Sequence, residues 1–312
     1  ARPDRAPRLS AIAFPDPPMP ELPDVELYLS ALAPRIVGRT LEGIRLANPF
    51  ILRTVQPRPS ELAGARVTGV RRIGKRIVIE LEGERFIVIH LMVAGRFRWL
   101  AAGAKIPGRI GLAAFDFANG TLALTEAGTT RRASIHLVRG AEGVRAMDRG
   151  GLEVLDATPA QFREALTRER HTLKRALTDP RILSGIGNAY ADEVMHRARL
   201  SPLKLTSSLS DEEIAALYDA TRDTLREWIE RLRQEAGDGF PEKVRAFHPE
   251  MAVHGRYGQP CPVCGAPVQR IVYAENETNY CARCQTGGRR LADRAMSRLL
   301  KEDWPRSMDE VE

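Results

Sequence analysis

The chain has 312 residues, with 47 lysines and arginines against 40 aspartates and glutamates and a net charge of +7. Its length suits about two domains of roughly 100–200 residues each, and no apolar run approaches the roughly 18 residues of a membrane-spanning helix. All four cysteines stand in CxxC pairs in the last sixth of the chain, which excludes a distributed disulfide framework and indicates a metal in a reducing compartment. The positive charge favours an anionic partner only weakly, because many basic proteins bind nothing negative.

The first 18 residues show no helical or strand periodicity. They contain five prolines and three arginines, so we expect a disordered arm, and their short apolar stretch is too interrupted for a secretory signal. Met19 is followed by Pro20, and a small second residue allows an initiator methionine to be removed. We therefore interpret residues 1–19 as a disordered extension or a mis-assigned start.

The body of the chain opens with an amphipathic helix and continues as short strands. Apolar residues repeat every three or four positions over 21–37, which predicts a helix that ends at Gly38. Strand-like runs separated by turn sequences follow at 41–46, 67–73, 76–81, 86–92, 112–117, 121–125 and 135–138. Many short strands behind one helix favour a β-sandwich or a barrel.

The pattern changes to helices from about Thr158. The predicted helices span 159–168, 172–178, 188–198 and 211–235. The longest begins with Ser210 followed by Glu213, the signature of a capping box. The second half is therefore predicted to be a helical domain with a cysteine-bearing module appended.

The cysteines predict a metal site. Cys261 with Cys264 and Cys281 with Cys284 form two knuckles separated by 16 residues, and four thiolates at this spacing can close a tetrahedron around one Zn²⁺. A pair of redox motifs is the alternative, and it is disfavoured because no redox βαβ unit surrounds them. A closed four-cysteine site makes the zinc structural, and the basic residues around it favour nucleic acid as partner.

Five motifs occur in a fixed order along the chain: PELPDVE at 20–26, GKR at 74–76, HLMVAG at 90–95, SGIGNAYADE at 184–193 and VHGRYGQPC at 253–261. Together they resemble the formamidopyrimidine-DNA glycosylase and endonuclease VIII family of base-excision repair enzymes. The resemblance implies a multidomain α+β fold. Its parts are a catalytic β-sandwich with a leading helix at 20–150, a helix–two-turn–helix DNA-binding domain at 151–250, a zinc ribbon at 251–290 and an extension at 291–312.

The resemblance also implies a reaction and its residues. Pro20, freed of Met19, becomes the amine nucleophile that attacks C1′ of the damaged nucleotide, and the resulting iminium allows the flanking phosphates to be eliminated. Glu21 moves protons at the sugar. Lys75 holds phosphate and tunes the site, and Glu193 helps to position the reacting end. On its own, a Pro-Glu pair is more often just the start of a helix.

Five further residues are expected to contact DNA. The turn at Gly187 and Asn188 opens a helix whose backbone N–H groups are expected to point at a phosphate, although two glycines before a helix are usually only a tight turn. His90, Arg132 and Arg256 are the other expected contacts. For His90, a buried structural histidine is the alternative.

The chain departs from the family pattern at several positions. Asn276 stands where the family has an arginine in the ribbon loop. Val93 replaces a methionine and Ala133 replaces a phenylalanine, two side chains that enter the DNA stack. We hypothesise weaker reading of the opposite base and better activity on single-stranded or distorted DNA. Arginines follow the ribbon around 291–300, where a short basic helix would lie on DNA or cap the ribbon.

The leading interpretation is a bifunctional DNA glycosylase and abasic-site lyase. The alternatives are a catalytically drifted relative that binds damaged or single-stranded DNA, and a zinc-ribbon transcription or RNA-associated protein, which leaves the Pro-Glu start unexplained. We expect a cytoplasmic, nucleoid-associated monomer that acts on damaged DNA, with no membrane partner. The sequence does not disclose which lesion is excised.

Overall fold

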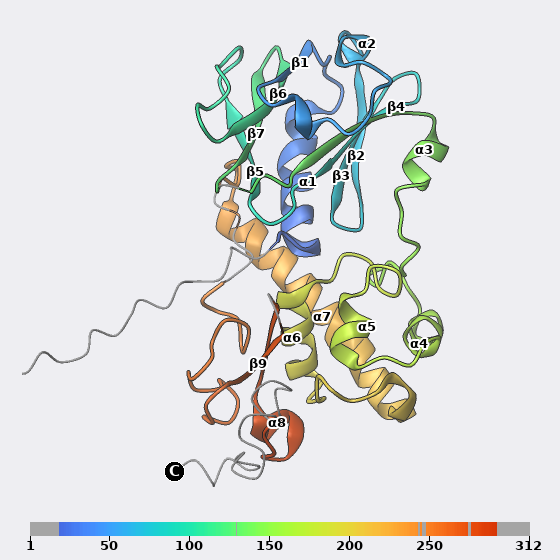
Figure 1. The fold of residues 1–312 in the computed structure, drawn as a ribbon, viewed down its shortest axis with the longest axis vertical. Coiled ribbons are helices and arrows are strands. Elements are labelled where there is room, and N and C mark those ends of the chain that lie inside the picture. Colours follow the sequence, from blue (N-terminus) through green and yellow to red (C-terminus); the bar gives the residue numbers. More distant parts are fainter. Residues whose placement is uncertain (1–18, 129, 243, 245–247, 274–275, 292–312) are drawn as a thin grey trace, which may run out of the picture.

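The computed structural model describes residues 19–291 apart from 129, 243, 245–247 and 274–275, and only the backbone of 273 and 276. Two sheets surround a long helix at one end, helices form the middle, and a small hairpin lies at the other end (Figure 1). The arm at 1–18 and the basic segment and tail at 292–312 lie outside the described residues.

Helix α1 (Leu22–Ile36) runs between the two sheets and forms their common core. Its apolar face is buried, with Val25, Leu32 and Ile36 completely inaccessible. Burial of side chains of this size stabilises the fold by about 1.5–3 kcal/mol each. The helix packs on β2 and on the long helix α7 of the second domain (Figure 1), so α1 joins the two domains.

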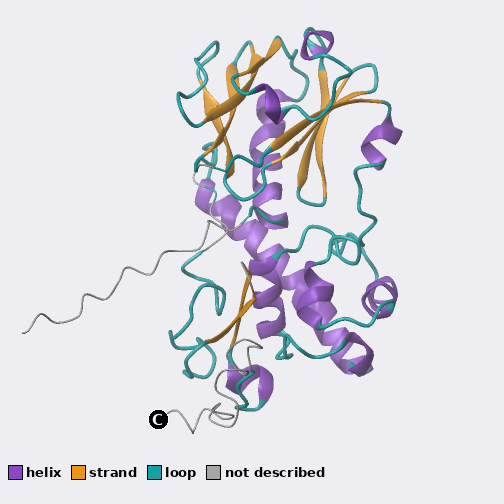
Figure 2. Cartoon of the chain, viewed as in Figure 1, coloured by secondary structure: helices purple, strands orange, loops and turns teal. Residues whose placement is uncertain are grey.

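Both sheets are four-stranded and antiparallel. One has the order β1-β6-β7-β5 and the other β2-β3-β4-β8. Their strands are β1 (Gly43–Leu46), β2 (Val67–Ile73), β3 (Arg76–Leu81), β4 (Arg85–His90), β5 (Gly95–Leu100), β6 (Gly111–Phe117), β7 (Gly120–Glu126) and β8 (Ser134–Arg139). The inner faces are apolar, and the orange strands in Figure 2 flank α1 on both sides. Of the two folds that the sequence favoured, a β-sandwich and a barrel, the structure has the β-sandwich.

The second domain is helical. Its elements are α4 (Pro159–Thr167), α5 (Leu173–Thr178), α6 (Asn188–Arg197) and the 26-residue α7 (Asp211–Ala236). The predicted capping box is present, because the Ser210 hydroxyl accepts the Glu213 N–H and the Glu213 carboxylate accepts the Ser210 N–H. Helix α6 packs on α5, on α7 and on the ribbon hairpin, so it lies at the centre of the lower half of the molecule (Figure 1).

The ribbon is a two-stranded hairpin, β9 (Gln269–Tyr273) and β10 (Asn276–Tyr280), followed by the short helix α8 (Ala282–Thr286). These three elements were not predicted individually. Nor were four further short helices, η1 (Pro49–Ile51), α2 (Pro59–Leu62), α3 (Ala141–Arg145) and η2 (Thr206–Ser208).

The helices and strands that were predicted agree with observed ones to within a few residues. The strand expected over 86–92 ends at His90, because Met92 adopts a left-handed φ of 52° in the turn that follows. The expected set also lacked β5, whose sequence GRFRWL alternates large and charged side chains. Its arginines face away from the core while Phe97 is completely buried, so period-two alternation was the signal that would have found it.

Candidate active site and zinc centre

The carboxylate of Glu21 lies at the start of helix α6. Its Oε2 accepts the backbone N–H of Gly187 at 2.6 Å and of Tyr190 at 3.3 Å, and its Oε1 accepts that of Ala189 at 2.9 Å. A carboxylate at a helix N-terminus satisfies donors that have no partner within the helix and interacts favourably with the helix dipole. A carboxylate has about four acceptor positions. At least three of them are filled here by backbone N–H groups.

Gly187 is required at this point for its small size. A Cβ there would lie 2.3 Å from Lys75 Nζ and 2.5 Å from Glu21 Oε1, well inside van der Waals contact. The same distances show that the amine of Lys75 and the carboxylate of Glu21 approach one spot. The expectation that the N–H groups after Gly187 point at a phosphate is thus not what the structure shows, because they point at Glu21.

Lys75 stands at the tip of the turn between β2 and β3. Gly74 allows the turn through its left-handed φ of 56°. Burial lowers the pKa of the Lys75 amine, which the charges of Glu21 and Asp24 partly offset, while Lys174 lowers it further. A lysine of reduced pKa beside a carboxylate is a typical acid–base environment.

A cavity of about 260 Å³ opens beside this pair. Met19, Lys75, His90 and Arg149 contribute to its lining. Pro20 is buried next to it, between Met19 and Glu21. The structure therefore brings three of the four residues expected to be catalytic, Pro20, Glu21 and Lys75, to one place.

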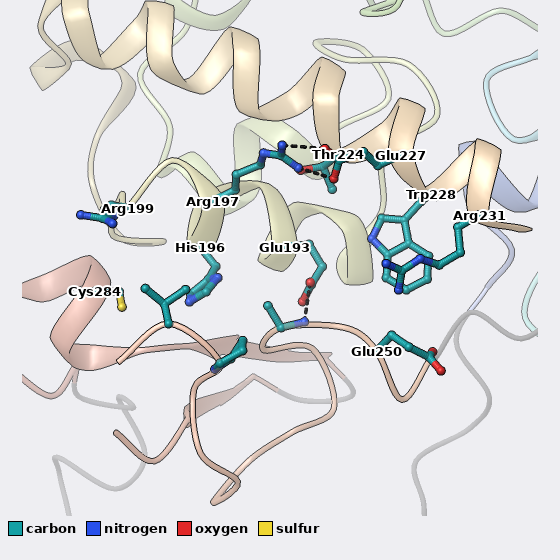
Figure 3. A pocket seen from close by; sticks show the side chains of 13 residues that line it. Glu193, His196, Arg197, Arg199, Thr224, Glu227, Trp228, Arg231, Glu250 and Cys284 are labelled. Carbon is teal, nitrogen blue, oxygen red and sulfur yellow. Dashed lines mark hydrogen bonds and ion pairs between the residues drawn. The ribbon is translucent and has the colours of Figure 1, made fainter. Parts of the chain in front are cut away.

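The fourth, Glu193, has a different environment. Its oxygens accept the backbone N–H groups of Ala252, Val253 and His254 at 2.7–2.9 Å. Burial raises its pKa, and these hydrogen bonds oppose the rise. Figure 3 shows the carboxylate pointing at this segment, beside a second cavity of about 340 Å³ that the side chain of Trp228 also lines. The Glu193 carboxylate thus fixes the segment that leads into the ribbon.

The neighbouring acid, Asp192, is a connector that the sequence motifs did not reveal. Its oxygens accept from Lys174 Nζ at 2.6 Å and from the Asn279 N–H at 3.0 Å, and Oδ2 lies 2.8 Å from His254 Nδ1. The carboxylate is completely buried, and buried charges occur where they are paired in this way. Adjacent acids on α6 therefore bind the ribbon through its entry segment and its hairpin. The Asp-Glu dipeptide in mid-helix was the available signal.

His90 lies at the end of β4, facing the cavity. Burial, with the nearby charges of Arg76 and Lys75 next in effect, lowers its pKa to about 4. Its Nδ1 accepts the Met92 N–H at 3.1 Å, so the neutral ring carries its proton on Nε2. His90 can therefore offer a neutral hydrogen-bond donor to an anion.

The other residues expected to contact DNA differ in their surroundings. Arg132 is exposed, on the loop before β8. Asn188 donates its side-chain N–H to the Glu277 carbonyl at 2.7 Å. Arg256 folds back on its own loop, donating to Gln259 and to the Met251 carbonyl at 3.0 Å. The last two therefore make protein contacts that tie down the ribbon and its entry loop.

The positions that depart from the family pattern lie at turns and strand ends. Val93 is half-buried in the turn before β5, and Ala133 is 3% exposed beneath the Glu126 carboxylate, which accepts its N–H at 3.1 Å. Asn276 is the first residue of β10. Neither Val93 nor Ala133 provides a large side chain that projects from the surface.

The four cysteines meet as predicted. Their sulfur atoms all lie within 4.8 Å of one another, with Cys264 and Cys281 at 3.4 Å and Cys261 and Cys284 at 3.9 Å. A tetrahedron with Zn–S bonds of about 2.3 Å requires S···S edges of about 3.8 Å, so this donor set fits one zinc ion. His196 Nε2 lies 3.3 Å from Cys261 Sγ, a contact from α6 to a ligand that the sequence did not indicate.

Comparison with known families covers most of the chain. Residues 19–136 match the formamidopyrimidine-DNA glycosylase N-terminal domain, residues 153–237 match the H2TH domain of the same enzymes, and residues 258–287 match the zinc finger found in FPG and IleRS. Formamidopyrimidine-DNA glycosylase of Thermus thermophilus is 36% identical over 284 residues, covering 86% of this chain and all of that protein. The enzyme of Heliobacterium modesticaldum is 34% identical over 277 residues, with 86% and 100% covered.

Solved structures agree. The MutM (Fpg) protein from Thermus thermophilus superimposes with a TM-score of 0.73 at 33% identity, covering 85% of this chain and 98% of that one. A mutant of the Lactococcus lactis FPG, solved with DNA that contains Fapy-dG, gives 0.75 at 27% identity, with 86% and 100% covered. The chain belongs to the formamidopyrimidine-DNA glycosylase family. It is a DNA glycosylase of base-excision repair whose zinc finger holds one structural zinc ion.

Within the described part of the chain, no helix is long and apolar enough to cross a membrane.

Proposed function

We propose that this glycosylase is bifunctional: it excises oxidised bases from damaged DNA and then cleaves the abasic site through a Schiff base on Pro20. The observation that carries the proposal is the position of Glu21. Its carboxylate is fixed by three backbone N–H groups, and it lies beside Lys75 and directly after Pro20.

The reaction uses these groups in sequence. The Pro20 nitrogen forms a bond to C1′ as the bond from C1′ to the base breaks, and the departing base takes a proton from water. The Glu21 carboxylate accepts the proton that the Pro20 nitrogen loses and delivers it to the sugar-ring oxygen, so the ring opens and an iminium joins Pro20 to C1′. The iminium acidifies the C2′ proton. Its removal expels the 3′ phosphate, and a second elimination expels the 5′ phosphate.

Pro20 can form this bond only as a free secondary amine. A chain that begins at Pro20 is therefore expected to be crosslinked to abasic DNA by borohydride, whereas a chain that begins at Ala1 is not crosslinked at Pro20. Peptide mapping of the adduct identifies the residue. Absence of a crosslink from the chain that begins at Pro20 would refute lyase action and favour the drifted, DNA-binding alternative.

Lys75, His90 and Arg132 are proposed to hold the phosphates around the lesion. Lys75 and His90 line the cavity beside Pro20, and Arg132 is exposed on a loop of the same domain. Asn188, Gly187 and Arg256 then act by shaping this surface and fixing the ribbon. Binding that depends on phosphates weakens steeply with salt. A flat response of Kd to ionic strength would contradict the proposal.

Single-stranded or distorted DNA is the proposed preferred substrate, since Val93 and Ala133 leave little to fill the gap when a base is extruded. Holding a duplex open without such a side chain costs a few kcal/mol more. Excision of one oxidised base from matched single-stranded and paired oligonucleotides measures the preference. A strong preference for duplex would exclude it.

A further inference from the structure

Behind the reactive end of the chain lies a second buried carboxylate, Asp24. It is completely inaccessible in the first turn of α1. Its Oδ2 accepts the backbone N–H of Glu21 at 2.8 Å, so it fixes the peptide unit that follows Pro20. Its other oxygen, Oδ1, is buried and has no hydrogen-bond partner among the described residues. A buried acceptor left in this way is destabilising, because it has lost its hydrogen bonds to water.

The nearest polar group to that oxygen is His248, on the segment that links α7 to the ribbon. Its Nε2 lies 4.0 Å from Asp24 Oδ1, and it too is buried without a partner in the described chain. The imidazole packs against Trp228 of α7, with ring centroids 4.9 Å apart. The side chain is only 9% exposed, so solvent does not readily satisfy the nitrogen.

Two orphaned atoms of complementary type therefore face each other across a gap that is only about 1 Å longer than a hydrogen bond. We propose that His248 is a positioning residue: its Nε2–H donates to Asp24 Oδ1, directly or through one buried water, and so fixes the carboxylate that holds the Glu21 N–H. This inference rests on the proposed function, because its value lies in the placement of Pro20 and Glu21.

The contact also ties the segment after His248 to two helices. His248 is followed closely by Met251, whose N–H bonds to the His248 carbonyl at 3.1 Å, and then by the segment that Glu193 clamps. The chain between α7 and the ribbon is thus tied to α6 by Glu193 and to α1 by His248. The segment that follows His248 therefore connects the first turn of α1, next to Pro20, with the ribbon.

Two substitutions separate a hydrogen bond from simple packing. His248→Phe keeps a ring against Trp228 but has no Nε2, whereas His248→Gln loses the ring but retains an N–H near that position. The readouts are the single-turnover rate constant for base excision, the rate of borohydride trapping and the Kd for DNA. His171→Gln is the control, because His171 is a remote histidine paired with the surface residue Glu169.

We expect His248→Phe to lower the excision and trapping rates about tenfold with Kd within twofold of wild type, and His248→Gln to remain within threefold. Equal rates for wild type and His248→Phe, or equal losses in both variants, would overturn the inference. If His248→Phe does not fold, His248→Asn replaces it, since its amide is too short to reach Asp24.

The experiment also distinguishes failure of the inference from failure of the proposed function. If wild-type protein that begins at Pro20 neither excises nor traps, the proposed function fails. The hydrogen bond is then judged alone by NMR of the imidazole. A slowly exchanging His248 Nε2–H that is lost in Asp24→Asn supports it, and a rapidly exchanging proton in wild type refutes it.

Discussion

Replacing Gly187 by alanine tests the central feature of the site. The new methyl carbon would lie 2.3 Å from Lys75 Nζ and 2.5 Å from Glu21 Cδ and Oε1, so both groups must retreat by about 1 Å to reach ordinary contact. Lys75 can move its flexible end. Glu21 cannot move so freely, because Gly187, Ala189 and Tyr190 hold its carboxylate through their N–H groups.

The displacement predicts a large kinetic effect and a smaller thermodynamic one. A misplacement of about 1 Å costs on the order of 100-fold in rate, while overpacking destabilises the fold by about 1–3 kcal/mol. We expect Gly187→Ala to lower the single-turnover excision rate about 100-fold while the protein stays folded.

The assay is excision of an oxidised base with enzyme in excess, alongside urea unfolding. Gly108→Ala is the matched control, because Gly108 is exposed and a Cβ there meets nothing within 4 Å. A Gly187→Ala rate within threefold of wild type would refute the reasoning that Glu21 must occupy this position.

Three further predictions concern Glu21, His90 and the zinc ion. Glu21→Gln turns an amide N–H₂ toward backbone donors, so excision should fall at least about 100-fold with a loss of about 1–3 kcal/mol in stability; retention of a tenth of the wild-type rate would contradict this. For His90, the folded pKa of about 4 lies below the ordinary value, so the unfolded state takes up the proton first as pH falls. The stabilisation is complete above about pH 6.5 and is lost toward pH 4, and wild type should lose about 2 kcal/mol more than His90→Gln between pH 7 and pH 5 in urea unfolding. An equal loss in both proteins would exclude that assignment. Elemental analysis should give one zinc per chain, and a strong chelator or Cys264→Ser should weaken DNA binding at least about tenfold, whereas unchanged Kd would show that the ribbon is dispensable.

Features encoded by neighbouring residues could be predicted from the sequence. The zinc site is one such feature. Each CxxC pair is a local sequence motif, and the two pairs need only come together once to form a four-cysteine site. The leading helix is another, since its apolar spacing, Pro23 and the stop at Gly38 lie within one short stretch.

Features that depend on which distant segments meet could not be predicted without the family resemblance. The loop at Gly187 has the composition of an anion-binding turn, and the anion is supplied by the protein itself, from Glu21, 166 residues away in the sequence. The contact of Arg256 with a phosphate stays a prediction, and in this structure its guanidinium donates to carbonyls and a side chain within five residues of it. Donor type was predictable in both cases, and the acceptor was not.

The first and second domains each hold half of the site, since Glu21 belongs to one and its N–H donors to the other. If the chain were divided at the exposed Gly150 and the two fragments were produced separately, neither fragment would contain the complete site. Only binding of the two fragments to each other would bring the Glu21 carboxylate back to its N–H donors. The appearance of base-excision activity on mixing would therefore report that the fragments have associated.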